Sequence, residues 1–284
     1  MKAGKHKYFA NNFLSMTDKK WENSEIVFAV ILVLVIVYLV IDSFGSLIAI
    51  IPVEGAIGSS KSAEVTAALD SVEKNPFVRA VVLRINSPGG TAAAIHEIYF
   101  KLLKLKGVKP VVISVDSLAA SGGYFIAMTS DYIIAKQSSE VGSIGVLTEL
   151  PTKEKDSSII TSGPFKREPD EPSVYRSLEF IKQDFLNAVK RARGEKLQIS
   201  LTELSEARTY NGFDALRLGL IDEIGSLEDA IIKAKSLAGI RVYRTIVIEP
   251  GEKVSSPLSV KFGNFKQNTT GAPVFYYLHI QVEQ

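Results

Sequence analysis

The chain has 284 residues, of which 46% are hydrophobic and 23% charged, and its net charge is +2. This length suits one core of roughly 150 to 200 residues with appendages, or two small domains. A charge so near zero, without long basic runs outside the N-terminus, argues against a nucleic-acid partner. The absence of cysteine excludes disulfides, thiolate metal sites and cysteine nucleophiles. Because His6, His96 and His279 lack zinc-motif spacing, we expect no metal and no cofactor.

The first elements are a leader at 1–25 and an uncharged apolar run at 26–41. As a helix the run would be about 24 Å long, slightly less than the bilayer core, and flanking residues can cover the difference. A buried core helix should carry a polar stripe, which is absent here apart from Tyr38. A cleaved signal peptide is the other alternative, because Ser43 and Gly45 are small residues at a suitable spacing. The long leader favours an uncleaved transmembrane anchor.

The distribution of lysines predicts the orientation of this anchor. Five lysines precede the apolar run, and the next Lys or Arg is Lys61. By the positive-inside rule, the leader stays in the cytoplasm and the rest of the chain lies outside the cell membrane.

From residue 47 onward, short β-branched runs alternate with segments of helical period, which predicts an α/β domain with a largely parallel sheet. We expect this domain to span 47–240, followed by a C-terminal extension at 241–284. The predicted strands are 47–53, 78–85, 110–115, 131–135 and 144–147. The predicted helices are 61–74, 92–106, 121–129, 172–193, 201–207, 212–218 and 227–238. Runs at 81–85 and 111–115 are apolar on both faces, as in interior strands.

Two segments interrupt this alternation. The polar stretch at 148–173 is too long for an ordinary connection, which indicates a functional or mobile segment. The tail after Pro250 has the composition of a loop until 274–280 (VFYYLHI), which is apolar again and is expected to dock on the domain.

The sequence NSPGG at 86–90 follows a predicted buried strand and begins a helix. Glycines there can turn backbone N–H groups toward a ligand, and the helix N-terminus favours negative charge. An ordinary strand-to-helix turn is the alternative.

The sequence DSLAASGGY at 116–124 has the same strand-to-helix setting, and small residues around Ser121 leave its hydroxyl approachable by a polypeptide. Taken alone, Ser121 could simply cap the helix. The two features together favour a reaction site.

These two motifs resemble those of the peptidase family that contains signal peptide peptidase A, and the sequence is more distantly similar to the Clp protease and crotonase fold. VGSIGV at 141–146, SGPFK at 162–166, ARTYNG at 207–212 and GLIDEIG at 219–225 also match the family. The resemblance covers about 47–240.

The resemblance implies a serine endopeptidase in which Ser121 is the nucleophile and Lys166 the general base, oriented by Ser143. Backbone N–H groups of Gly90 and Gly122, with Gly89 beside them, would form the oxyanion hole. It also implies a peptide or unfolded-protein substrate at the membrane, such as a signal peptide, and a ring-shaped homo-oligomer.

Several alternatives stay open. Lys153 and Lys155 are substitute bases if SGPFK is misaligned, since the spacing from Ser121 to Lys166 is short and Arg167 follows where an acidic residue is common. A Ser-His-Asp triad lacks a histidine near position 146, and His96 is expected to be an exposed helix residue. A catalytically inactive scaffold binding a membrane partner and a stomatin-directed membrane protease are the alternative functions, although the serine motif of the latter lacks Gly-Gly-Tyr.

Overall fold

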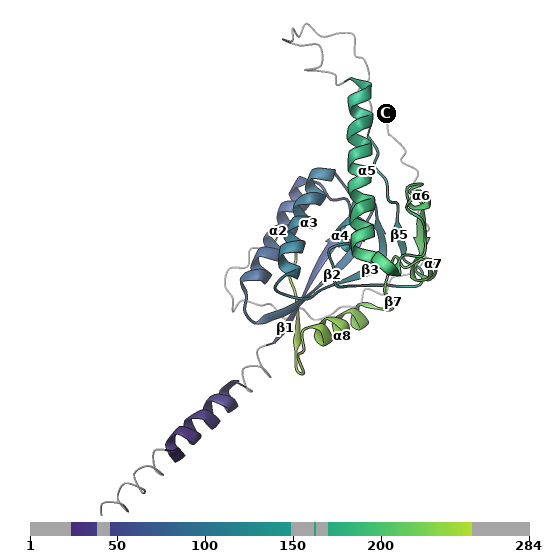
Figure 1. Ribbon diagram of the computed structural model, residues 1–284. Coiled ribbons are helices and arrows are strands. Elements are labelled where there is room, and N and C mark those ends of the chain that lie inside the picture. The colour runs from purple at the N-terminus through teal and green to yellow at the C-terminus, as the bar shows by residue number, and fades with distance from the viewer. Residues whose placement is uncertain (1–23, 39–45, 149–161, 163–169, 252–284) are drawn as a thin grey trace, which may run out of the picture.

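The computed structural model describes residues 24–38, 46–148, 162 and 170–251, and its centre is one eight-stranded sheet (Figure 1). The strand order is β6-β5-β3-β2-β1-β8, and β4 joins β3 to β7 beside this path. The strands are β1 Leu47–Glu54, β2 Val78–Ser87, β3 Val111–Ala120, β4 Tyr132–Ala135, β5 Glu140–Gly142, β6 Thr209–Asn211, β7 Glu223–Ile224 and β8 Arg244–Val247. Every pairing is parallel except β5 with β6, which confirms the predicted α/β class.

Helices cover both faces of the sheet. They are α2 Ser59–Lys74, α3 Ala92–Lys106, α4 Gly122–Ala127, α5 Glu171–Arg193, α6 Leu201–Leu204, α7 Gly212–Arg217 and α8 Leu227–Leu237, with a 3-10 turn at Gly194–Lys196. The larger core lies between the sheet and α2, α3, α4 and the end of α5, and α8 closes a smaller core on the opposite face. Strands β1, β2 and β3 are apolar on both faces because each face is buried.

The predicted strand at 144–147 is wrong. The strand in this part of the chain is β5, and it ends at Gly142. Gly142 and Ser143 both have positive φ, so the chain turns away from β3 before the apolar residues begin. Ile144 is buried by packing in the larger core and not by strand pairing.

Two further differences concern the C-terminal third. The helix predicted at 201–207 ends at Leu204. Strand β8 pairs in parallel with β1, so the sheet includes residues that the sequence places in the C-terminal extension.

Residues 24–38 form a helix that precedes β1, and its large apolar side chains are exposed. Positions 39–41 of the predicted anchor lie outside the described residues, as does the apolar segment at 274–280. Within the described part of the chain, no helix is both long and apolar enough to cross a bilayer.

Only the C-terminal half of α5 packs on the domain. The helix begins after Asp170, whose carboxylate accepts the Ser173 N–H at 3.1 Å, and its first half projects from the domain (Figure 1). Its buried side chains all lie between Phe185 and Arg193.

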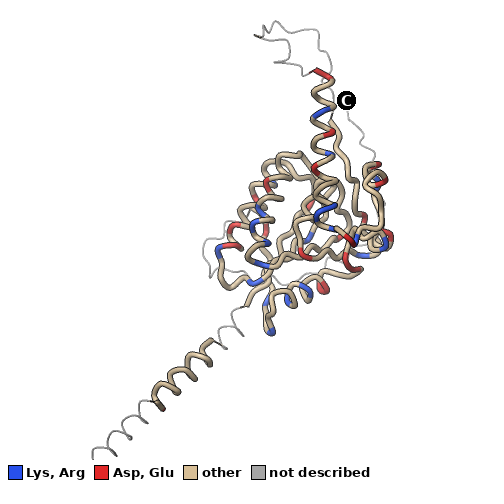
Figure 2. Tube along the Cα trace, viewed as in Figure 1, with Lys and Arg blue, Asp and Glu red and all other residues tan. Residues whose placement is uncertain are grey.

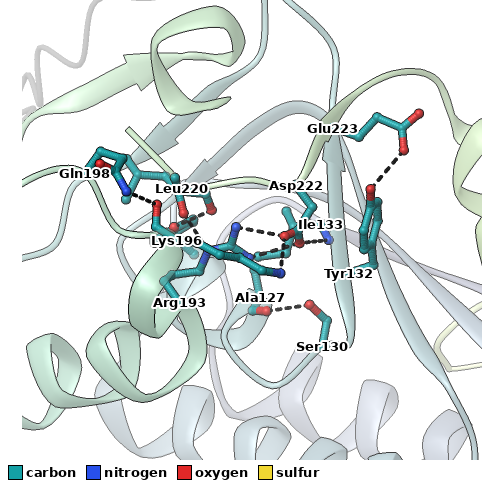
Figure 3. A network of polar contacts seen from close by, with 12 residues as sticks. Ala127, Ser130, Tyr132, Ile133, Arg193, Lys196, Gln198, Leu220, Asp222 and Glu223 are labelled. Carbon is teal, nitrogen blue, oxygen red and sulfur yellow. Dashed lines mark hydrogen bonds and ion pairs between the residues drawn. The ribbon is translucent and has the colours of Figure 1, made fainter. Parts of the chain in front are cut away.

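A buried ion pair fastens the end of α5 to the sheet (Figure 3). The side chains of Arg193 and Asp222 are each 4% exposed, and two guanidinium nitrogens donate to the carboxylate at 3.0 and 2.9 Å. The third, Nε, donates to the Gly219 carbonyl at 2.6 Å. Asp222 also accepts the Ile133 N–H at 2.8 Å and a bond from Lys196 Nζ at 2.7 Å. Every charged atom therefore has a partner, as burial requires.

Two opposing effects act on the Asp222 carboxyl. Burial raises its pKa, but the hydrogen bonds from Arg193 and Lys196 outweigh burial and hold the pKa below its usual value. A carboxyl whose pKa is lower in the folded than in the unfolded chain stabilises the fold at neutral pH. This contribution is lost as the pH falls from the usual pKa of about 4 toward the folded-state value.

We therefore expect Arg193→Met to lower the free energy of unfolding by about 3 to 5 kcal/mol at neutral pH, because it leaves a buried carboxylate without its main partner. Arg217→Met is the control, since the Arg217–Asp214 pair is largely exposed and should contribute less than about 1 kcal/mol. Urea unfolding of the full chain in detergent measures both. Equal losses in the two variants would contradict the assignment, and so would a loss in Arg193→Met that does not shrink in acid.

Candidate active site

Ser121 occupies a strained turn between β3 and α4. Its backbone has φ 50° and ψ −121°, a conformation that a residue with a side chain adopts only at a cost of about 1 to 3 kcal/mol. The Ser121 N–H donates to the Gly142 carbonyl at 2.8 Å, and its own carbonyl accepts the Phe125 N–H at 2.9 Å. Such strand-turn-helix geometry is typical of a nucleophile elbow, which holds a serine hydroxyl out from the end of a sheet.

Capping does not explain this serine. Its side chain accepts no capping hydrogen bond from α4, and its φ is positive where N-cap residues are extended. The simple capping alternative is therefore wrong.

The Gly89-Gly90 turn lies directly against the Ser121 turn. A Cβ on Gly89 would lie 2.7 Å from the Gly122 nitrogen and 3.1 Å from the Ser121 Cβ, and Gly89 itself has φ 105°. On Gly90, a Cβ would meet the Ile57 carbonyl oxygen at 1.9 Å. Neither position has room for a side chain, so the two turns touch through their backbones.

Ser87, the last residue of β2, also belongs to this contact. The Ser87 hydroxyl donates to the Gly55 carbonyl at 2.7 Å and accepts the Gly89 N–H at 3.1 Å. A Cβ on Gly123 would lie 2.9 Å from the Ser87 carbonyl oxygen. Ser87 is fully buried and thus positions both glycine turns, a role that the sequence analysis did not assign to it.

The three glycines proposed for an oxyanion hole differ in their backbone bonding. The Gly89 N–H is already used by Ser87. Within the described residues, the N–H groups of Gly90 and Gly122 donate no hydrogen bond, and Gly122 is the first residue of α4, where an amide has no intrahelical partner. Gly90 and Gly122 thus offer two amides beside the serine turn.

Ser143 is fixed next to the same turn. It follows Gly142, whose carbonyl holds the Ser121 N–H, and its own N–H donates to the Arg208 carbonyl at 2.8 Å. Its φ is 52°, a second strained serine in the described structure. The antiparallel pairing of β5 with β6 supplies this support, which explains why the ARTYNG segment belongs to the site.

Tyr124 connects α4 to the buried ion pair. Its hydroxyl is buried and donates to the Leu220 carbonyl at 2.7 Å, next to the Gly219 carbonyl that Arg193 binds. Burial raises the pKa of this hydroxyl far above its usual value, so it remains a donor. The tyrosine of DSLAASGGY therefore fixes α4 to the GLIDEIG segment.

The candidate bases Lys166, Lys153 and Lys155 lie outside the described residues. His96 is described, and its Nε2 lies 3.2 Å from Asp184 Oδ2 on α5 while its ring contacts Phe125. It is partly buried between α3 and α5, not a free exposed helix residue as predicted. Among the described residues, no three His, Cys, Asp or Glu side chains gather as metal ligands.

This geometry predicts that Gly89→Ala abolishes the peptide hydrolysis that the family resemblance implies, since the added methyl group would displace Gly122 and the Ser121 turn. Gly239→Ala is the control for backbone strain, because Gly239 also has positive φ but an added Cβ there meets no atom within 4 Å. Both variants should lose roughly 1 to 2 kcal/mol of stability from φ alone. Casein hydrolysis that survives in Gly89→Ala, or fails equally in Gly239→Ala, would contradict the role of this contact.

Two family models match the chain. The model of peptidase family S49 matches residues 104–241, and the Clp protease model matches residues 39–140. Together they cover both glycine turns and Ser121.

A solved structure supports the fold. A mutant of the 1510-N membrane-bound stomatin-specific protease superposes with a TM-score of 0.52 at 17% identity, covering 72% of this chain and 98% of that one. At this identity the likeness concerns the fold alone.

Sequence relatives give the family. Protease 4 of Haemophilus influenzae is 36% identical over 68% of this chain and 35% of its own length, and the chloroplastic serine protease SPPA of Arabidopsis thaliana is 30% identical over 66% and 30%. The chain therefore spans about a third of these two relatives. A Synechocystis protein named as a protease is 33% identical over 81% of this chain and 95% of its own. The chain belongs to peptidase family S49, in the group that resembles signal peptide peptidase A, and has a Clp-protease-like fold.

Proposed function

We propose that this protein is a membrane-anchored serine endopeptidase that uses Ser121 as nucleophile and Lys166 as general base. The observation that carries the proposal is the strained Ser121 turn, packed against a glycine turn with two unused amides beside it. A serine hydroxyl is a weak nucleophile unless a base takes its proton. Lys166 is the proposed base by resemblance to the family.

The reaction follows from these roles. Ser121 Oγ attacks the carbonyl carbon of the scissile peptide while its proton passes to the neutral Lys166 amine. The N–H groups of Gly90 and Gly122 stabilise the negative oxygen that forms, which is worth about 3 to 4 kcal/mol per donor in comparable sites. Lys166 returns the proton to the leaving amine, and the Ser121 ester is then hydrolysed by water that Lys166 deprotonates.

Ser143 is proposed to orient the lysine amine. Its backbone is fixed by Arg208 and its chain neighbour Gly142 holds the Ser121 N–H, so the two serines have a defined separation. A hydroxyl that hydrogen-bonds the lysine amine would favour one orientation of that amine toward Ser121 over many others. Gly89, whose N–H donates to Ser87, is proposed to shape the hole and not to donate into it.

The membrane anchor is proposed from residues 26–41. In their described part, large apolar side chains are exposed along the whole helix, and such a surface is stable only in an apolar medium. With the lysine-rich leader in the cytoplasm, the domain at 47–240 and the extension at 241–284 lie outside the membrane. Signal peptides and unfolded proteins at this surface are the proposed substrates.

A homo-oligomer is also proposed. The projecting half of α5 exposes Tyr175 and Phe180, the latter by 76%, and an aromatic surface of this kind suits a second copy of the chain.

Ser121→Ala should remove peptide hydrolysis by several orders of magnitude while leaving the unfolding midpoint unchanged or higher, because it removes a nucleophile without creating a buried cavity. Ser205→Ala, at the partly buried C-cap serine of α6, is the control. A fluorophosphonate probe should label the wild type and Ser205→Ala but not Ser121→Ala. A wild-type chain that the probe does not label would favour the inactive scaffold.

Lys166→Arg should lower kcat/KM by about 100-fold or more, because arginine stays protonated and cannot act as the base. In the wild type, kcat/KM should rise with pH as the Lys166 amine loses its proton. Lys153→Arg and Lys155→Arg should keep activity and the same pH profile. An active Lys166→Arg enzyme, with loss in either control, would transfer the role of base to that lysine.

A further inference from the structure

The edge of the sheet where the parallel strands begin has a repeated surface pattern. Three loops enter β2, β3 and β8 there, and each exposes one apolar side chain: Phe77 by 49%, Val108 by 66% and Val242 by 54%. Each apolar residue is flanked by basic residues, in KNPFVR at 74–79, KGVK at 106–109 and RVYR at 241–244. These three segments contain six Lys or Arg and no Asp or Glu.

Backbone bonds fix these loops around the start of β1. The Leu47 N–H donates to the Phe77 carbonyl at 2.8 Å, and the Arg244 N–H donates to the Ser46 carbonyl at 3.0 Å. The loops before β2 and β8 therefore bracket the point where the chain enters the sheet. The third loop is joined to the first by Lys109 Nζ, which donates to the Val72 and Asn75 carbonyls at 2.5 and 2.6 Å.

The exposure of Phe77 is built into its turn. The Asn75 side chain accepts the Phe77 N–H at 2.9 Å, and the Asn75 carbonyl accepts the Val78 N–H at 3.2 Å. Val78 is then buried and Phe77 points away from the core. Of the nearby carboxylates, Glu73 binds Lys101 and Lys104 outside these loops, whereas Asp131 pairs with Lys106 of the second loop at 3.4 Å.

We propose that this edge, defined by the loops 74–79, 106–109 and 241–244, docks on a lipid bilayer that contains anionic headgroups. Apolar tips flanked by cations match the boundary between acyl chains and phosphates, where aliphatic and aromatic side chains insert and Lys and Arg bind the charge. Figure 2 shows Lys and Arg along this edge and on the neighbouring α8. A highly charged protein partner would not need three separate apolar tips.

The connection to residues 24–38 favours a membrane over other partners. Only eight residue steps separate Tyr38 from Ser46, and an extended chain of that length reaches under about 30 Å. This edge is consequently the part of the domain that the linker can bring to the bilayer. The choice of a membrane as the partner rests on the proposed anchor. The pattern of exposed apolar and basic residues in the three loops does not depend on that anchor.

The test uses the full chain in lipid nanodiscs, with a fluorophore on single cysteines and a spin-labelled lipid as quencher. The chain has no cysteine of its own, so Val108→Cys and Val242→Cys give one label each. Ile31→Cys reports the anchor, and Phe180→Cys on the projecting part of α5 is the control away from this edge. We expect quenching at positions 108 and 242 well above that at 180, and stronger when phosphatidylglycerol is added to phosphatidylcholine.

Charge reversal tests the cations. Since each basic residue at an anionic surface changes partitioning about fivefold, Lys74→Glu with Arg241→Glu should remove most of the gain that phosphatidylglycerol gives at position 108. Arg176→Glu with Arg217→Glu is the matched control and should leave it unchanged. Cleavage of soluble casein should be equal in both double variants and the wild type, which separates this inference from the proposed catalysis.

The outcomes are distinct. Labels at 108 and 242 that are quenched no more than the label at 180 overturn the inference, whatever the label at 31 shows. An emission shift at 108 or 242 without quenching by lipid identifies a protein partner, including a second copy, and also overturns it. Quenching at 108 and 242 but not at 31 supports the docking edge and refutes the anchor.

Discussion

The contact between the Gly89-Gly90 turn and the Ser121 turn is the constraint on which the rest of the site depends. Two strand-to-helix connections must approach until their backbones touch, and a single methyl group between them would push them apart. The parallel register of β2 and β3 brings both connections to one edge, and its irregularity between Ile85 and Ser87 places Ser87 opposite Ala119, close to Ser121 in the chain. Glycine is required here because there is no space for a side chain, as much as for its backbone freedom.

Elements distant in sequence surround this contact and stabilise it. The pairing of β5 with β6 fixes Gly142 and Ser143, and so holds the strained serine by its N–H. The hydroxyl of Tyr124 ties α4 to the segment that also binds Arg193. Strain at Ser121 persists because both of these attachments hold the turn in place, which is the general condition for a strained residue in a native fold.

Much of this arrangement could be predicted from the sequence, and what could not has physical reasons. The helix at 92–106 and the buried strands were predicted because period and burial agree there. Strands β6, β7 and β8 have two to four residues and exist through partners far along the chain, so no local pattern marks them. Arg193 has the appearance of an ordinary basic residue at a helix end, and its burial depends on Asp222, 29 residues later. Ser121 was found by its small neighbours, whereas its positive φ is a tertiary effect.

The direction of the parallel strands fixes how far a substrate has to travel. Strand β3 begins at the edge that holds the 106–109 loop and ends at Ala120, directly before Ser121, and its ten residues measure about 33 Å. If the first edge rests on a bilayer with the strands upright, the proposed nucleophile Ser121 lies about that far above it, beyond the headgroups. A polypeptide still held in the lipid must then present about ten extended residues before its chain can be cut. Polypeptides with a shorter segment outside the lipid would escape the proposed cleavage, so the length of the sheet would set a minimum length for the substrate.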